Sequence, residues 1–342
     1  MSYTLLRTQI LRGPCAIVYN AQDASGDQYL FSQGDVKLEL GHQTFDIVNS
    51  SFGIVDKRSQ QRTAKVSFTP VGQIPSSTQV GLLWPYFNAT YNFQPGDSAF
   101  KNATGGDPYV AVVAKSGECY KFYGAIITKM PEIMLSADKT QLGGIEFTCV
   151  GKQGADWSTA ASLFDTTGYT YASVLTSANF TVSSIKTGAY LGFYSPSVPF
   201  GSSSGGYFSA NSGFTISSAV QLQPVQTDEF GLYDWTIGDI SASCSCAPLD
   251  VSPSQILSAM PMQGAGAGRG ASLSLGLNLT VSPSPQGASG TGLLQVQLNN
   301  ANVFNTGFDY NTSAQRIPQL QFTTVRTYSS GGLALPAVIT IN

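Results

Sequence analysis

Charged side chains are scarce in this sequence of 342 residues. Lys, Arg, Asp and Glu make up 11% of the chain, against about 25% in an ordinary soluble domain. The net charge is −3, from 17 basic and 20 acidic residues. The chain therefore offers no concentrated basic face to neutralise nucleic-acid phosphates, and its composition argues against a sequence-specific DNA- or RNA-binding protein.

Histidine is nearly absent, since His42 is the only one, and catalytic triads or histidine metal sites would depend on it alone. The glycine-rich segment 264–270 lacks the Lys-Ser/Thr end of a phosphate-binding loop. Asp228 and Glu229 are adjacent, so on a strand they point to opposite faces and make a poor glycosidase pair. We expect no enzyme, no catalytic residue, no metal and no cofactor.

Long hydrophobic runs are also missing. No stretch approaches the roughly 18 apolar residues of a membrane span, and Arg7, Gln9 and Arg12 interrupt the N-terminal segment where a signal peptide would be apolar. The five cysteines have no zinc spacing. Cys244 and Cys246 fall on one face of an alternating segment, which predicts buried small hydrophobes. These features predict no membrane association and a protein that stays in the cytoplasm.

What the sequence does have is alternation with a period of two residues. Apolar residues make up 42% of the chain, and Ser, Thr, Gln and Asn supply most of the polar positions between them. Val36, Leu38 and Leu40 alternate with Lys37 and Glu39, which predicts a strand with one buried face. Similar patterns occupy 64–68, 122–128, 214–216, 220–223, 273–281, 294–298 and 320–323. Short helices are predicted at 75–84, 156–164 and 253–260.

An internal repeat is the most informative feature. Residues 64–76 match 242–254 at an offset of 178, with two prolines in register. Residues 29–32 match 206–209 at 177, and 146–150 match 321–325 at 175. We predict two tandem β-sandwich or barrel domains, each with a short flanking α-helix: 1–156 with an N-terminal arm at 1–12, a linker at 157–187, and 188–342. Chance similarity between two β-rich halves is the alternative.

The shortage of charge is concentrated in the second half. Residues 1–156 carry 13 basic and 13 acidic side chains, whereas residues 157–342 carry 4 and 7. Interface centres are depleted in charge. The second half is therefore predicted to be covered by other copies of the chain.

The sequence resembles the tail tube, or major tail, proteins of long-tailed bacteriophages. The resemblance rests on the strand that ends at Pro70, the short helix near 78–84, the hairpin-like segment 120–128 and the closing strand 144–150. In that family each tube domain is a β-sandwich flanked by a helix, and six domains form a ring around DNA. Some members carry two tube domains per chain and build the ring from three chains, which the repeat here resembles.

The resemblance implies a structural virion protein that forms homo-trimeric, pseudo-hexameric rings stacked into a DNA-conducting tube in the tail, assembled in the host cytoplasm. Expected partners are the chain itself, the tape measure, tail-tip and terminator proteins, and DNA that passes without specific binding. Candidate inter-ring contacts lie in the N-terminal arm and in a long hairpin: Leu5, Arg7, Phe52, Ile54, Asp56, Lys57 and Arg58. Candidate lumen residues are polar positions on inner strands: Lys37, Glu39, Gln221 and Gln223.

Two other functions stay open at the sequence level. A tail-tip or baseplate hub protein shares the duplicated tube fold but forms a single ring. A two-domain β-sandwich adhesin or carbohydrate-binding module would use exposed aromatic residues, for which the tyrosine-rich segments 169–171 and 190–194 are candidates. Aromatic residues on strands more often belong to cores or interfaces.

Overall fold

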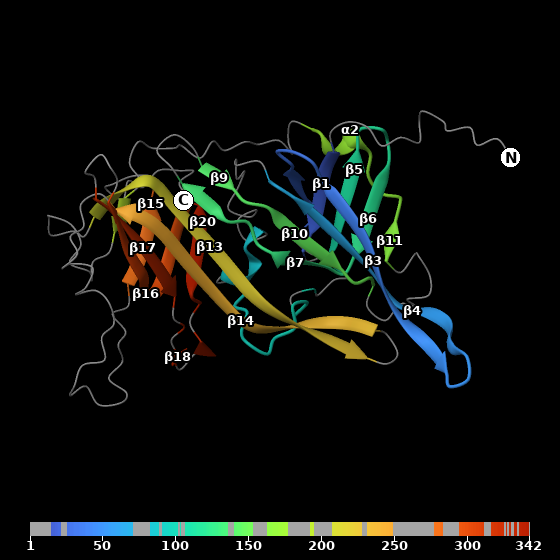
Figure 1. Ribbon diagram of the computed structural model, residues 1–342. Helices are drawn as coiled ribbons and strands as arrows, with labels where there is room; N and C mark the ends of the chain where they lie inside the picture. The colour runs from blue at the N-terminus through green and yellow to red at the C-terminus, as the bar shows by residue number, and fades with distance from the viewer. Residues whose placement is uncertain are drawn as a thin grey trace.

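The computed structural model describes the chain in segments separated by gaps. These are residues 15–21, 26–70, 83–88, 91–101, 103, 107–135, 140–152, 163–176, 192–194, 207–227, 231–248, 277–282, 294–310, 316–324, 326, 328–329, 332–333 and 335–341. The fold is mainly β, as the alternation predicted, with antiparallel pairing throughout (Figure 1).

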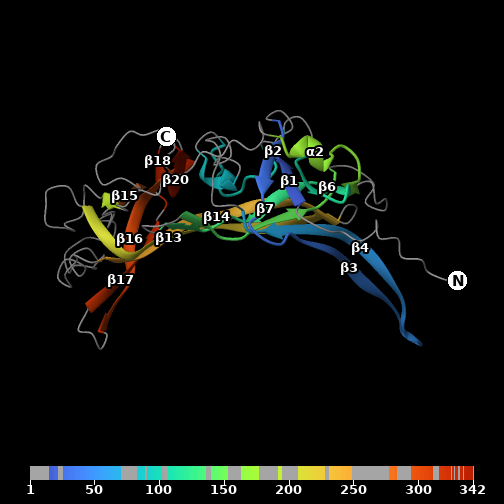
Figure 2. The same cartoon turned by 90° about the horizontal axis from the view of Figure 1, so that it is seen from above.

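Two sheets of the first half pack face to face as a β-sandwich (Figure 2). The outer sheet has the order β11-β6-β5-β1-β2, and the inner sheet has the order β3-β4-β10-β7. The strands are β1 (Cys15–Asn20), β2 (Gln28–Phe31), β3 (Lys37–Asn49), β4 (Gly53–Phe68), β5 (Tyr109–Ala114), β6 (Cys119–Tyr123), β7 (Ala125–Lys129), β10 (Ile145–Cys149) and β11 (Phe164–Asp165).

The second half forms one large sheet of order β12-β15-β16-β17-β14-β13-β8-β9, in which β20 also pairs with β16 and β12 also pairs with β13. The pairing of β12 with β13 therefore closes the strands from β12 to β13 into a ring. The strands are β8 (Ile133–Leu135), β9 (Thr140–Leu142), β12 (Gly192–Tyr194), β13 (Tyr207–Thr227), β14 (Gly231–Pro248), β15 (Leu277–Ser282), β16 (Leu294–Tyr310), β17 (Arg316–Thr324) and β20 (Ala337–Ile341). A separate ladder joins β18 (Tyr328–Ser329) and β19 (Gly332–Leu333).

Helical structure is sparse in the described residues. A 3-10 turn, η3 (Pro85–Phe87), packs its three residues into the core. The helix α2 (Tyr171–Val174) begins at Thr170, whose side chain accepts a hydrogen bond from the Ser173 backbone N–H in a capping box. The helix covers the outer face of β1, where Val174 contacts the buried Ala16 and Val18. The predicted helices at 75–84, 156–164 and 253–260 lie mostly or wholly outside the described residues.

The strand pairing of the first half recurs in the second half. Leu38 pairs with Val66 on β4, and Ile216 pairs with Cys244 on β14, so both partners are displaced by 178 residues. The offset holds to the hairpin tips, where Asn49 pairs with Gly53 and Thr227 pairs with Gly231. Even the bulges correspond: they follow Gln43 and Ile47 on β3, and Gln221 and Val225 on β13.

The neighbouring strands repeat in the same way. Phe147 of β10 pairs with Val66, and Phe322 of β17 pairs with Cys244. In the outer layer, Ala16 pairs with Phe31, and Phe193 pairs with Phe208. The single strand β16 corresponds to β6, β7 and β8 of the first half together. The two halves are thus built on one pairing scheme.

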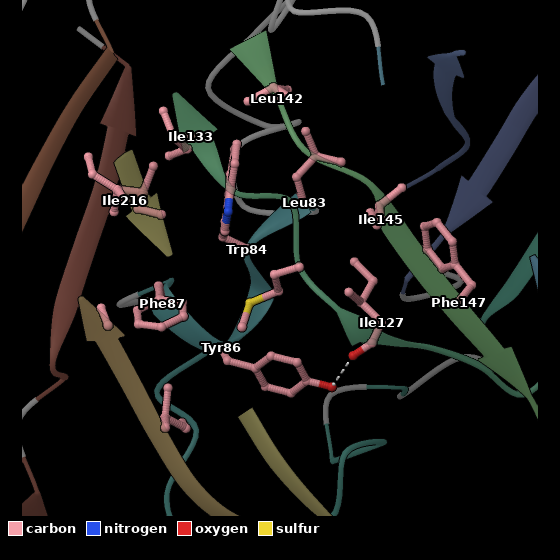
Figure 3. Packing of buried hydrophobic residues seen from close by; sticks show 14 of the residues in the cluster. Leu83, Trp84, Tyr86, Phe87, Ile127, Ile133, Leu142, Ile145, Phe147 and Ile216 are labelled. Atoms are coloured by element: carbon pink, nitrogen blue, oxygen red, sulfur yellow. Dashed lines mark hydrogen bonds between the residues drawn. The ribbon is translucent and has the colours of Figure 1, made fainter. Parts of the chain in front are cut away.

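The halves are not separated in space. The β8–β9 hairpin comes from the first half of the sequence but pairs with β13, at Ile133 opposite Ile216. One hydrophobic cluster runs from Ile17 to Ile339, and Figure 3 shows Ile216 beside Ile133, Trp84 and Phe87. The segment 157–187, expected as a linker, contributes β11 and α2 to the first half where it is described. The domain boundaries therefore stay predictions.

Candidate functional site

The inner strands of both halves form one arched layer. Figure 2 shows it edge-on, with the outer strands and α2 covering one face; no described strand or helix covers the other face, which we call the open face. The β3–β4 and β16–β17 hairpins lie at the two ends of the layer and bend toward the open face. The pairing of β8 with β13 connects the two halves of the layer. We take the open face and its two ends as the candidate site.

In the first half the open face is lined by charged residues that pair with one another. Lys37 and Glu39 form an ion pair on β3, and the Lys65 Nζ on β4 lies 3.2 Å from the Glu146 Oε1 on β10. Thr128 on β7 donates a hydrogen bond of 3.0 Å from its hydroxyl to the same oxygen. The apolar residues between them, such as Val66 and Phe147, are buried on the other face.

The charges on this face balance. The hydrogen bond and charge of Glu39 raise the pKa of Lys37, and the hydrogen bond and charge of Lys37 lower the pKa of Glu39. Both side chains are exposed, so water screens the pair and it contributes little to folding. The effect is a wet surface without a run of unpaired cations in the described residues.

The same face in the second half is polar and nearly uncharged. In the repeat, Thr215 and Ser217 of β13 take the places of Lys37 and Glu39. Ser243 of β14 takes the place of Lys65, and Gln321 of β17 takes the place of Glu146. Gln221 and Gln223 continue this face along β13 and are exposed. The structure therefore brings all four predicted lumen residues, Lys37, Glu39, Gln221 and Gln223, to one face of one layer.

The predicted inter-ring contacts between residues 52 and 58 lie near the tip of the β3–β4 hairpin, which extends beyond the body of the molecule (Figure 1). Phe52 is 82% exposed and Ile54 is 55% exposed. Asp56 and Lys57 are exposed on β4, and the Lys57 Nζ lies 3.4 Å from the Asp46 Oδ1 on β3. Arg58 is opposite Phe45 in the ladder, but its side chain is not described. Leu5 and Arg7 lie outside the described residues.

A cluster of polar groups around Asp27 lies in the outer layer. The Tyr169 hydroxyl donates to the Asp27 Oδ2 at 2.6 Å, the Tyr109 hydroxyl donates to Oδ1, and Asn20 also donates to Oδ1 at 3.2 Å. Burial, together with the hydrogen bond to Asp27, raises the pKa of Tyr109 to about 12. A carboxylate held by two neutral phenols joins β5 to the segments around it. This geometry stabilises the fold and provides no activated nucleophile.

One cavity near the core is too small for a typical ligand. A cavity between Tyr19, Tyr86 and Phe93 has a volume of about 30 Å³, enough for roughly one water molecule and far below the roughly 300 Å³ of a typical ligand pocket. All five cysteines are free, and four of them, including Cys244 and Cys246, are buried as predicted. Burial raises the pKa of the Cys149 thiol, so its reactive thiolate form is disfavoured.

Within the described segments, no three His, Cys, Asp or Glu side chains are grouped so as to hold a metal ion. None of the described helices is long and apolar enough to cross a membrane. His42 lies in β3 opposite Arg62, and its side chain is not described.

Searches against protein-family models and against curated proteins found no match to this chain.

Proposed function

We propose that this protein is a structural subunit of the tail tube of a long-tailed bacteriophage. The observation that carries the proposal is the repeated pairing scheme: two copies of one set of inner strands lie next to each other in a single arched layer with a polar open face. Three such chains would supply six copies around a ring, and stacked rings would form the tube.

The open face suits the wall of a channel for DNA. Release of counterions by Lys and Arg supplies most non-specific affinity for DNA. On this face Lys37 and Lys65 are paired with Glu39 and Glu146, and the second half presents Ser, Thr and Gln instead. DNA passing along such a wall would meet hydrogen-bonding groups but no concentrated positive charge, so it would slide without being held.

Stacking of rings requires a segment that reaches from one ring to the next. The β3–β4 tip, with Phe52 and Ile54 exposed beside Asp56 and Lys57, combines apolar area with charges of both signs. It is the proposed inter-ring contact. The tape measure protein inside the tube and the tail-tip and terminator proteins at its ends are the proposed further partners, and the virion tail is the proposed location.

Electron microscopy of the purified protein at increasing concentration tests the proposal. Long tubes of uniform width are the expected result. Single rings that never stack would identify a tail-tip or baseplate hub instead. A protein that is monomeric at every concentration would contradict both. Phe52→Asp is expected to stop stacking but leave the rings intact, and Leu175→Asp, at an exposed position after α2, is the matched control.

A further inference from the structure

A joint between the two halves is visible within the chain. The β8 strand adds to the outer edge of β13, with Ile133 opposite Ile216, Met134 opposite Thr215 and Leu135 opposite Phe214. The Ser217 hydroxyl donates a hydrogen bond of 3.1 Å to the Glu132 Oε1 next to it. The tip of one hairpin of the first half therefore extends the sheet of the second half.

The repeat places both components of this joint a second time in the molecule. The β3 edge at Lys37 and Leu38 corresponds to Thr215 and Ile216 of β13. The β16–β17 hairpin tip, where Tyr310 pairs with Arg316, corresponds to the β8–β9 tip, where Met134 pairs with Gln141. Among the described strands, neither the outer edge of β3 nor the edge of β16 at Asp309 and Tyr310 has a partner. The two edges lie at opposite ends of the layer in Figure 2, so one chain does not join them.

Exposure differs between the two copies at the joint. Ile216 is 2% exposed in the second half, where β8 covers it, but the corresponding Leu38 is 37% exposed and Leu40 beyond it is 66% exposed. The unpaired backbone N–H and C=O groups of a sheet edge are a template for pairing with another strand, and exposed apolar side chains on that edge favour the pairing. The β3 edge is thus the uncovered version of a surface that the fold covers once already.

The long hairpins differ in the same way. Backbone N–H groups of Gly96 and Ala99 donate hydrogen bonds of 2.7 Å to the carbonyl oxygens of Ile237 and Trp235, respectively. A loop of the first half therefore lies along β14 in the β13–β14 hairpin of the second half. Leu232 of that hairpin is 8% exposed, whereas the corresponding Ile54 of the β3–β4 hairpin is 55% exposed. Two separate positions therefore show one repeat covered by its neighbour and the other repeat not covered.

We propose that the outer edge of β3, from Lys37 to Leu40, pairs antiparallel with the β16 hairpin tip, from Gly307 to Tyr310, of a second copy of this chain. Each copy then supplies one edge and receives one tip, so the contact is heterologous and repeats head to tail. The inference deepens the proposed function and rests on it for the closed ring, while the pairing itself rests on the internal joint.

Crosslinking between two variants, each with one cysteine added to a Cys15→Ser background, tests the pairing; the other four native cysteines are buried. Lys37→Cys chains are mixed with Tyr310→Cys chains under mild oxidation, and a disulfide-linked dimer is expected in the mixture but not from either variant alone. Phe308→Cys and Asp309→Cys in place of Tyr310→Cys determine the register. Lys115→Cys, at an exposed position after β5, replaces Lys37→Cys as the matched control and should give no dimer.

A charge placed on the edge gives a second measurement. Leu40→Asp is expected to weaken association about tenfold or more, because a buried unpaired carboxylate would lie in the new sheet. Its far-UV circular dichroism and thermal midpoint should match those of the unmodified protein, since Leu40 is exposed in the single chain. Leu175→Asp is the control that should assemble normally.

The outcomes separate this inference from the proposed function. Tubes or rings without any crosslink from position 37 to positions 308–310, and with normal assembly of Leu40→Asp, would overturn the pairing and leave the tube proposal standing. A specific crosslink in protein that never forms rings or tubes would support the pairing and overturn the tube proposal. Failure of the chain to associate at all would overturn both.

Discussion

Aromatic residues in this chain have two different environments. Phe147 is 0% exposed, and its ring centroid lies 4.7 Å from that of Tyr19 and 6.1 Å from that of Phe68. Phe52, at the β3–β4 tip, is 82% exposed. The phenylalanine side chain therefore contributes to folding at position 147, whereas at position 52 it is available for contacts with other molecules.

Truncation should distinguish these environments. Phe147→Ala is expected to lower the free energy of unfolding by about 3–5 kcal/mol, because it removes buried apolar area and leaves a cavity. Phe52→Ala is expected to change it by no more than about 0.5 kcal/mol. Urea unfolding of the two variants at a concentration where the protein is monomeric provides the measurement. Similar losses in both would contradict the packing described for β10.

The Asp27 cluster predicts a dependence of stability on pH. Burial alone would raise the pKa of Asp27, but hydrogen bonds from Tyr109, Tyr169 and Asn20, with the charge of Lys121, lower it. A carboxylate with a lowered pKa stabilises the fold above its unfolded value of about 3.9, and this contribution disappears as the pH falls through the folded value. The unmodified protein should therefore lose stability in this acid range.

Asp27→Asn is expected to be less stable than the unmodified protein at pH 7 and to lose less on acidification. Tyr169→Phe removes only one of the hydrogen bonds to Asp27, so an intermediate result is expected. Thermal midpoints measured from pH 7 down to pH 3 test both variants. Parallel curves for all three proteins would show that Asp27 is not stabilised in this way.

At the scale of the element, a backbone bend separates two strands of the first half where the second half has one continuous strand. Gly124 separates β6 from β7 with a φ of +62°, and a Cβ atom there would lie 2.2 Å from the Gly151 carbonyl oxygen. The bend places β6 in the outer sheet and β7 in the inner sheet. In the second half β16 spans the corresponding positions and pairs with β20 and β15 near its start and with β17 farther along.

Gly124→Ala is expected to destabilise the protein by at least about 1–3 kcal/mol, because alanine disfavours a positive φ and its methyl group would overlap the backbone of Gly151. Gly34→Ala is the control, since a methyl group on Gly34 would meet no atom within 4 Å and its φ is not positive. Chemical unfolding of both variants should show a loss only for Gly124→Ala. An unaffected Gly124→Ala variant would mean that the bend is not required.

Alternation in the sequence predicted the central strands because their burial follows a period of two: Ala64, Val66 and Phe68 are all buried. The prediction of one buried face was wrong for Leu40, which is 66% exposed, because β3 is an edge strand and none of the described segments covers that end. The segment 122–128 was predicted as one alternating strand, but it divides at Gly124 between two sheets. A backbone bend of this kind leaves no periodic signal.

At the scale of the whole molecule, one core serves both halves. The cluster that contains Phe147 also contains Ile237 and Ile339, and the β8–β13 ladder crosses between the halves. The sequence repeat predicted the corresponding strands, but it did not predict this crossing, because a pairing between distant segments depends on tertiary packing. The four candidate lumen residues were predicted from their polar alternation, and their common face follows from the same crossing.

A shared core predicts a single unfolding transition. Phe147→Ala in the first half and Ile237→Ala in the second, at residues that are both 0% exposed, should lower the midpoint of the same transition. Differential scanning calorimetry of the monomeric protein measures this. Two transitions, each shifted by only one of the variants, would show that the halves unfold independently.

The pairing of β8 with β13 also means that β8 is synthesised well before the strand that it pairs with. The partner of Leu135 is Phe214, about 80 residues farther along the chain. At the roughly 5–20 residues per second of ribosomal synthesis, about 4–16 s pass between the synthesis of β8 and that of its partner. During that interval the nascent first half carries an unpaired strand edge that can pair with another nascent chain, so expression at a high level, which brings many nascent chains together, should produce more aggregate than expression at a low level.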